Sequence, residues 1–66
     1  MADNIYGALV TTALYALNSK SRDLVFEAYG QVKMAQRLEA ITQSEFMELS
    51  RMLVRDGINN PQVGLN

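Results

Sequence analysis

The chain has no cysteine, no histidine and no tryptophan, and its 66 residues include a single proline. Without cysteine there can be no disulfide and no thiolate metal site, and without histidine there is no imidazole ligand. No glycine-rich phosphate loop is present, no serine lies near a credible base, and the seven carboxylates are scattered rather than paired. We therefore expect no enzyme, no catalytic residues, no metal site and no cofactor.

Long apolar runs and an excess of positive charge are also missing. The formal net charge is −1, so the overall charge would not draw the chain to nucleic acid or to an anionic membrane. The longest uncharged run, residues 4–19, is too short and too polar to span a bilayer. The first four residues lack the basic region of a secretory signal. We expect a cytoplasmic protein that does not enter the membrane.

Apolar residues are abundant for a chain of this size. They make up 48% of the sequence, yet a chain this short buries only about 60% of the surface that its unfolded form exposes. Domains below about 70–80 residues usually supplement the core with disulfides, a metal or oligomerisation. Since the first two are excluded, we expect a homodimer or a fold that depends on a partner protein.

The C-terminal third of the chain has the clearest helix signals. Thr42 and Glu45 fit the capping box, in which each side chain accepts a hydrogen bond from the other residue's backbone N–H. Ile41 and Phe46 stand at the positions of a hydrophobic staple. At the far end we expect Gly57 to adopt the left-handed conformation that closes many helices. Between these ends, apolar residues repeat at helical spacing at Phe46, Leu49 and Leu53.

Two further helices precede this one. Asp3 or Asn4 can cap the first helix, and Ser21 can cap the second. Apolar residues spread over about half the circumference of the first helix, which predicts a core position with two neighbours. A helix lying on a membrane surface is the alternative, although this one lacks the usual lysine or arginine. In the second helix, Ala28 and Ala35 share the apolar face and allow the first helix to approach closely.

These signals predict an all-α fold, a three-helix bundle with helices at about residues 4–18, 22–40 and 43–56. We expect the second and third helices to form an antiparallel or crossed hairpin that the first helix closes. A single domain would span residues 1–58. The remaining residues, 59–66, contain the proline and have no periodicity, so we expect a flexible tail.

Two surface patches are candidate binding sites. On the second helix Phe26 lies beside the cations Arg22, Lys33 and Arg37. Such a patch suits an acidic and partly apolar partner surface. A solvated basic face with Phe26 covered by a chain terminus is the alternative. On the third helix Met47 and Val54 form a small apolar patch, which a wrapped core or a homodimer seam would also explain. The candidate contacts are Phe26, Lys33, Met34, Arg37, Met47, Arg51, Val54 and Arg55.

Residues 33–53 also resemble a helix-turn-helix motif, which would imply DNA binding. Ala35 would lie inside the first helix, and Thr42 would open the second after a short turn. Two features depart from the motif, because Glu39 stands where glycine is usual and the turn is one residue too long. In this alternative function, a DNA-binding regulator, the contacts would be Gln43, Ser44, Arg51 and Arg55.

One more pattern spans the same turn: Ile41-Thr42, Glu45-Phe46, Leu49 and Leu53. It resembles the short helical hairpin of the SHOCT family over residues 31–54. In that family an Ile-Thr pair ends one helix, and an acidic-Phe pair and a leucine-rich helix follow. Ala40 stands where the family usually has glycine.

As a whole, a small acidic all-helical chain without cysteine or histidine is similar to the accessory proteins of bacteriophages and mobile elements. That resemblance implies a phage-encoded, stoichiometric binder of another protein. We therefore predict a small protein–protein interaction module, a cytoplasmic regulator, adaptor or inhibitor that acts by occluding a surface of its partner.

Overall fold

Three α-helices and one π-helical turn build the part of the chain, residues 5–64, that the computed structural model describes. The elements are α1 (Ile5–Ser19), α2 (Arg22–Arg37), α3 (Gln43–Leu53) and η1 (Val54–Ile58). No strand occurs within this range, so the predicted all-α, three-helix fold is confirmed. The predicted caps of the first helix, Asp3 and Asn4, lie outside the described residues.

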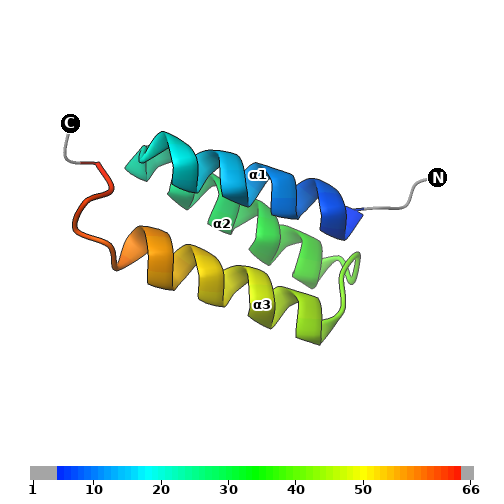
Figure 1. Cartoon of the computed structure of the whole chain (residues 1–66). Coiled ribbons are helices and arrows are strands. Elements are labelled where there is room, and N and C mark those ends of the chain that lie inside the picture. The colour runs from blue at the N-terminus through cyan, green and yellow to red at the C-terminus, as the bar shows by residue number, and fades with distance from the viewer. Residues whose placement is uncertain (1–4, 65–66) are drawn as a thin grey trace.

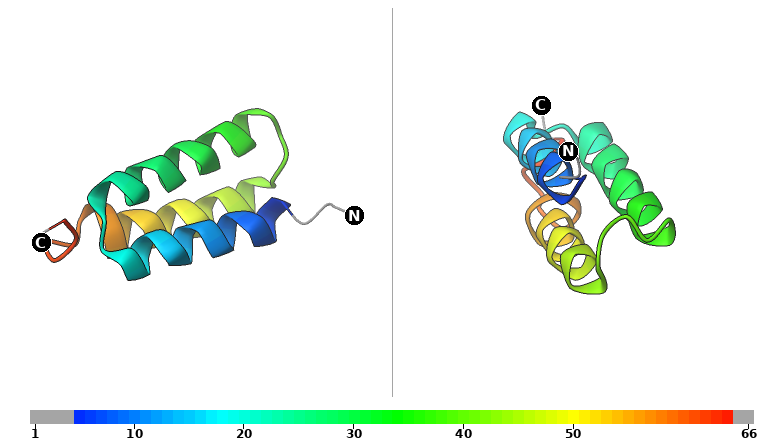
Figure 2. Two further views of the ribbon diagram at one scale, coloured as in Figure 1. Left: turned by 90° about the horizontal axis from the view of Figure 1, so that it is seen from above. Right: turned by 90° about the vertical axis from the view of Figure 1, so that its right-hand side faces the viewer.

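The three helices lie side by side along the long axis of a molecule that measures 37 × 20 × 14 Å (Figure 1). Seen from the end, they occupy the corners of a triangle (Figure 2). Short turns join them, so α1 and α2 run antiparallel, and so do α2 and α3. The hairpin of the second and third helices is therefore the antiparallel form, and α1 closes it. None of the helices in the described range is long and apolar enough to cross a membrane.

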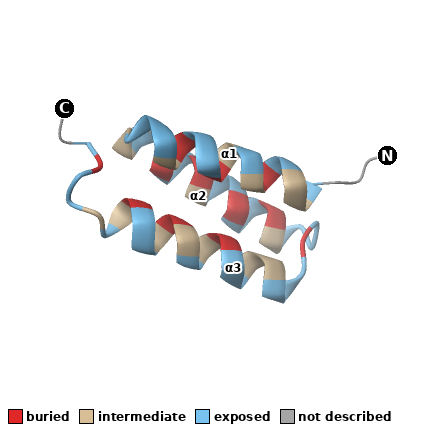
Figure 3. Cartoon of the chain, viewed as in Figure 1, coloured by how far each residue is buried: buried red, intermediate tan, exposed pale blue. Residues whose placement is uncertain are grey.

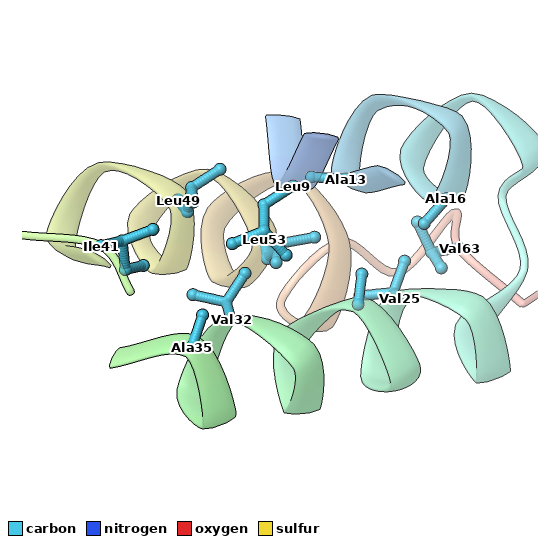
Figure 4. Close-up of a cluster of buried hydrophobic side chains, with 11 residues drawn as sticks. Leu9, Ala13, Ala16, Val25, Val32, Ala35, Ile41, Leu49, Leu53 and Val63 are labelled. Carbon is cyan, nitrogen blue, oxygen red and sulfur yellow. The ribbon is translucent and has the colours of Figure 1, made fainter. Parts of the chain in front are cut away.

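The core is built mainly from small and medium-sized apolar side chains that the three helices turn inward (Figure 3). Figure 4 shows these side chains gathered around Leu53, which has no exposed surface. The predicted apolar face of α2 is buried at Val25, Ala28, Val32 and Ala35. Because α1 also turns Ala13 and Ala16 inward, the surfaces where α1 and α2 meet consist largely of short side chains.

The start of α3 forms as its signals predicted. The Glu45 backbone N–H donates to the Thr42 hydroxyl (3.1 Å), and the Thr42 N–H donates to the Glu45 carboxylate (2.9 Å), which completes the capping box. Ile41 before the cap is buried, and Phe46 after it is half-buried against the core. α2 begins in a similar way, with the Ser21 hydroxyl accepting a hydrogen bond from its first turn.

α2 ends at Arg37, three residues earlier than predicted. Glu39 has a left-handed backbone with φ of 60°. Its N–H donates to the Gln36 carbonyl oxygen (3.0 Å), and the Ala40 N–H donates to the Ala35 carbonyl oxygen (2.8 Å), which is the Schellman pattern of a helix end. A glutamate thus occupies the position that glycine usually takes, and its side chain is exposed.

The C-terminal end of the third predicted helix differs from its prediction. α3 ends at Leu53, and the chain continues as η1, where the Asn59 N–H donates to the Val54 carbonyl oxygen (2.8 Å). Gly57 lies within this turn and its φ is not positive, so the predicted left-handed conformation is wrong. Glycine is needed there for another reason, because a Cβ atom at this position would lie 2.7 Å from Val25 Cγ1. The backbone of η1 therefore packs directly on α2.

Residues 59–64, part of the predicted tail, pack against the turn between α1 and α2. Val63 is 3% exposed and belongs to the core cluster. The Gly64 N–H donates to the Lys20 carbonyl oxygen (2.8 Å). The last two residues of the predicted tail, 65–66, lie outside the described range.

Arg22 holds this C-terminal segment through backbone carbonyl groups. Its guanidinium donates to the carbonyl oxygens of Ile58 (3.0 Å), Asn60 (3.1 Å) and Val63 (3.0 Å). Arg22 is half-buried by these contacts. It is therefore not part of the exposed basic face to which the sequence assigned it.

Candidate functional site

A shallow groove runs between α2 and α3, and no residue of α1 lines it. Its volume is about 360 Å³. The lining residues are Tyr29 of α2 and, from α3 and η1, Gln43, Phe46, Met47, Ser50, Arg51 and Val54. We refer to this feature as the α2–α3 groove.

The spacing of residues along α3 explains why one side of the helix is left for the groove. Met47, Ser50 and Val54 follow one another at intervals of three or four residues, so they share a face. Leu49 lies on the adjacent face and fills the core. We call the side formed by Met47, Ser50 and Val54 the floor of the groove. The Ser50 hydroxyl donates to the Phe46 carbonyl oxygen (2.7 Å), so this polar group already has a hydrogen-bond partner within its own helix. The floor can therefore take apolar contacts without leaving this hydroxyl unpaired.

The wall contributed by α2 is aromatic and cationic. Tyr29 lines the groove, and the Lys33 Nζ atom lies over its ring, 5.4 Å from the centroid. Toward the turn, the Gln36 side-chain amide donates to the Gln43 side-chain oxygen (3.3 Å) and links the two helices. This glutamine pair bridges the groove near the turn between α2 and α3.

The glutamine pair at one end and the contacts of Arg22 at the other set the register of the hairpin. Counting residues along the antiparallel helices from these two contacts places Lys33 about level with Met47 and Phe26 about level with Val54. Phe26 is 51% exposed and Met47 is 48% exposed, whereas Val54 is half-buried. Large apolar side chains therefore stand open to solvent along both helices of the groove.

The cations of this region lack carboxylate partners. Within the described part of the chain, the only ion pair joins Arg55 Nε to Asp56 Oδ1 at 2.9 Å, on the surface. The hydrogen bond between these two side chains raises the pKa of Arg55 and lowers the pKa of Asp56. Lys33, Arg37 and Arg51 make no such pair. Their charge is therefore open to a partner.

The carboxylates of α3 are engaged away from this groove. Glu45 completes the capping box. Glu48 accepts a hydrogen bond from the Tyr6 hydroxyl of α1 (2.8 Å), which raises the pKa of Tyr6. These two residues are part of a second hollow, between α1 and α3, whose lining is Tyr6, Val10, Glu48, Leu49 and Met52. α3 thus presents a carboxylate toward α1 and a guanidinium toward the α2–α3 groove.

The structure brings part of the two predicted patches together. Met47, Arg51 and Val54 line the groove, and Lys33 lies against its wall. The two patches between which the sequence could not choose therefore meet along one feature. Phe26 lies at the level of its far end.

The other three predicted contacts are placed differently. Met34 is 51% exposed, but its position on the helical wheel turns it away from α3. Arg37 is exposed one turn beyond Lys33. Arg55 is exposed and paired with Asp56, and it does not line the groove.

The sequence did not assign Tyr29, Phe46 or Ser50 to a binding site. Tyr29 flanks the apolar stripe of α2, and Phe46 was predicted only as a residue of the hydrophobic staple. For Ser50, its i, i+4 spacing to Val54 was the available signal. The inter-helix register, which decides that these residues meet, cannot be read from either helix alone.

Exposed apolar surface is not limited to the groove. Leu14 and Tyr15 of α1 are 47% and 65% exposed, and Leu38 after α2 is 70% exposed. Tyr6, by contrast, is half-buried against the core. The surface that led us to expect an oligomer or a partner is therefore only partly covered within the chain.

The arrangement of α2 and α3 differs from a helix-turn-helix motif. In that motif the two helices cross at about 90–120°, whereas here they lie side by side (Figure 1). Gln43, which the DNA-binding alternative assigned as a contact, accepts a hydrogen bond from the Gln36 side chain. Across residues 5–64 no group of acidic side chains is placed to hold a metal ion.

Comparison of the chain with protein-family models, with curated proteins and with solved structures gave no match.

Proposed function

We propose that this chain is a small, non-enzymatic, cytoplasmic protein that binds a partner protein through the α2–α3 groove and acts as a regulator, adaptor or inhibitor by covering the partner's surface. The observation that carries the proposal is a combination of three features of the groove. The Ser50 hydroxyl is already hydrogen-bonded within α3, Met47 is exposed, and the nearby cations have no carboxylate partner among the described residues. The partner that fits such a groove is partly apolar and acidic.

The energetics favour an apolar contact supported by charge. Burying a side chain such as Phe26 or Met47 completely is worth about 1.5–3 kcal/mol relative to leaving it exposed. Both keep roughly half of their surface in solvent, so part of that free energy remains available on binding. Lys33 and Arg51 add selectivity and speed of association more than affinity.

A pull-down from a bacterial lysate tests the proposal, with the captured protein identified by mass spectrometry. We expect the wild-type chain to retain a partner that the double variant Lys33→Glu with Arg37→Glu and the single variant Met47→Ser both lose. All three sites are exposed, so circular dichroism should show unchanged helicity.

The matched control removes an exposed apolar side chain elsewhere. Tyr15 of α1 is 65% exposed and lies outside the groove, so Tyr15→Ser should keep the partner. Equal capture by the wild type and by both groove variants would contradict the proposal.

We also propose that the free chain self-associates through α1, where large apolar side chains remain exposed. Leu14 is 47% exposed on a helix, Ile5–Ser19, that carries no charged side chain. Sedimentation equilibrium at micromolar concentration should give a homodimer for the wild type and a smaller mass for Leu14→Glu. A folded monomer at these concentrations would rule out self-association and leave the partner proposal standing.

A further inference from the structure

The α2–α3 hairpin has two sides, and the chain fills only one of them. On the inner side α1 lies along the seam between the two helices and buries its apolar face there (Figure 2). On the outer side the same two helices border the α2–α3 groove. Helices in bundles pack by lying along the seam between their neighbours, so the outer seam has the geometry that a further helix requires.

The dimensions of the groove agree with a helical occupant. The lining residues contributed by α3 and η1 run from Gln43 to Val54, which at about 1.5 Å per residue is roughly 17 Å, or about three turns. Met47, Ser50 and Val54 present side chains at helical intervals along the side formed by α3 and η1. A helix that places apolar residues at i, i+3 or i+4, and i+7 matches this repeat.

The charge around the groove sets the flanks of that helix. Lys33 stands on the α2 wall and Arg51 on the α3 wall, and no carboxylate lines the groove. α1, which fills the inner seam, has no charged residue within Ile5–Ser19. An occupant of the outer seam therefore differs from α1, because it meets a cation on each side of its apolar stripe.

The helices of a second copy fit this groove poorly. α1 has no carboxylates within its described length. On α3, Glu45 and Glu48 are hydrogen-bonded within their own chain. α2 has the exposed carboxylates Asp23 and Glu27, but it would also bring Lys33 and Arg37 against the same cations, so it does not offer acidic residues on both flanks. The occupant is therefore a different polypeptide.

We propose that the α2–α3 groove binds an acidic amphipathic α-helix of another protein, with aspartate or glutamate on both flanks of an apolar stripe, and that this helix completes a four-helix bundle. The proposal rests on the proposed function and adds the chemistry and secondary structure of the partner segment. Phe26 and Met47 contact the apolar stripe, and Lys33 and Arg51 contact the acidic flanks.

A panel of stapled 16-residue helical peptides tests this directly. Members share apolar residues at i, i+3 or i+4, and i+7, vary these among Leu, Phe and Met, and carry either glutamate or lysine at the flanks. Each is titrated into ¹⁵N-labelled protein, and the amide chemical shifts give the affinity and the site. We expect at least one glutamate-flanked peptide to bind at least about tenfold more tightly than its lysine counterpart, with shifts at Tyr29, Met47, Ser50, Arg51 and Val54.

The double variant Lys33→Glu with Arg51→Glu supplies the matched control. Both side chains are exposed, so the variant should keep its fold, and it should prefer the lysine-flanked peptides. The proposal is overturned if no glutamate-flanked member binds, if the two flanks bind equally, or if the shifts centre on α1. It is also overturned if the titration shows only self-association of the chain.

The two proposals fail in distinguishable ways. A partner that the pull-down recovers in a groove-dependent manner, while no peptide binds, would overturn the acidic helix and keep the proposed function. Groove variants that capture the same partner as the wild type would overturn the proposed function.

Discussion

The inner and outer sides of the α2–α3 hairpin are built from the same two helices but differ in the size and charge of their side chains. On the inner side α2 presents Val25, Ala28, Val32 and Ala35, and these side chains are buried. On the outer side it presents longer side chains, among them Phe26 and Lys33, and these are exposed. Short side chains allow α1 to approach closely, whereas long and flexible ones leave a surface that can adapt to a contact. Amphipathicity therefore explains the inner side, and the outer side requires a different reason for its apolar residues.

The largest expected effect is a cavity on the inner side. Leu53→Ala removes a side chain with no exposed surface, and we expect the free energy of unfolding to fall by about 2–5 kcal/mol. Met47→Ala, on the groove side, should change it by no more than about 0.5 kcal/mol. Urea unfolding monitored by circular dichroism measures both. Similar losses for the two variants would remove the distinction between the sides.

A pair of glycines gives the next effect, with opposite signs. Gly57→Ala places a Cβ atom 2.7 Å from Val25 Cγ1, so we expect a loss of about 1–3 kcal/mol. Gly30 is exposed on α2, and a Cβ atom there would have no neighbour within 4 Å, so Gly30→Ala should stabilise the fold by up to about 1 kcal/mol. Combining Gly57→Ala with Val25→Ala should cost less than the sum of the two single changes, which a double-mutant cycle in urea would show. Additive losses would mean that the close approach to α2 is not the cause.

Arginines on the two sides should also differ. Arg22→Ala removes donors from three backbone carbonyl groups, and because the side chain is only half-buried we expect a loss of about 1–2 kcal/mol. Amide hydrogen exchange at Gly64 should accelerate at the same time. Arg37→Ala, an exposed change on the outer side, should leave both the stability and this exchange rate unchanged. Protection at Gly64 that survives without Arg22 would show that Val63 alone holds the segment.

The smallest effect concerns the contact between α1 and α3. The hydrogen bond to Glu48 raises the pKa of Tyr6, so Glu48→Gln should lower it toward the ordinary tyrosine value of about 10. Since the pKa of Tyr6 is higher in the folded state than in the unfolded state, the hydrogen bond stabilises the fold at a pH below the ordinary tyrosine pKa. That contribution is lost as the pH rises through the raised pKa. The ¹³Cζ shift of Tyr6 against pH measures the change, and an identical titration in the variant would show that the bond does not form in solution.

The start signals in the sequence were sufficient for two of the helices. Thr42 and Glu45 form the predicted capping box, and Ser21 caps α2. These motifs act between residues three positions apart, so their partners are adjacent in the sequence. The end signals were weaker. Glycine is the residue that usually adopts the left-handed conformation at a helix end, but here Glu39 adopts it and Gly57 does not.

The candidate site could be predicted in part. Periodicity places Met47, Arg51 and Val54 on one face of their helix, and these three residues line the groove. The contribution of Tyr29 depends on the register of the hairpin, which the side chains of both helices set together. Arg55 pairs with the neighbouring Asp56 and does not line the groove.

Local sequence, through its caps and apolar periodicity, was enough to specify an all-helical chain with three segments, because helix formation depends on residues within about four positions of one another. The tertiary structure decided which residues of different segments contact one another. Arg22 bonds to carbonyl groups 36 to 41 residues away, and Gly57 packs on Val25 across a similar distance in sequence. Such contacts depend on the relative position of whole helices, and so does the α2–α3 groove, whose lining comes from α2 on one side and from α3 and η1 on the other.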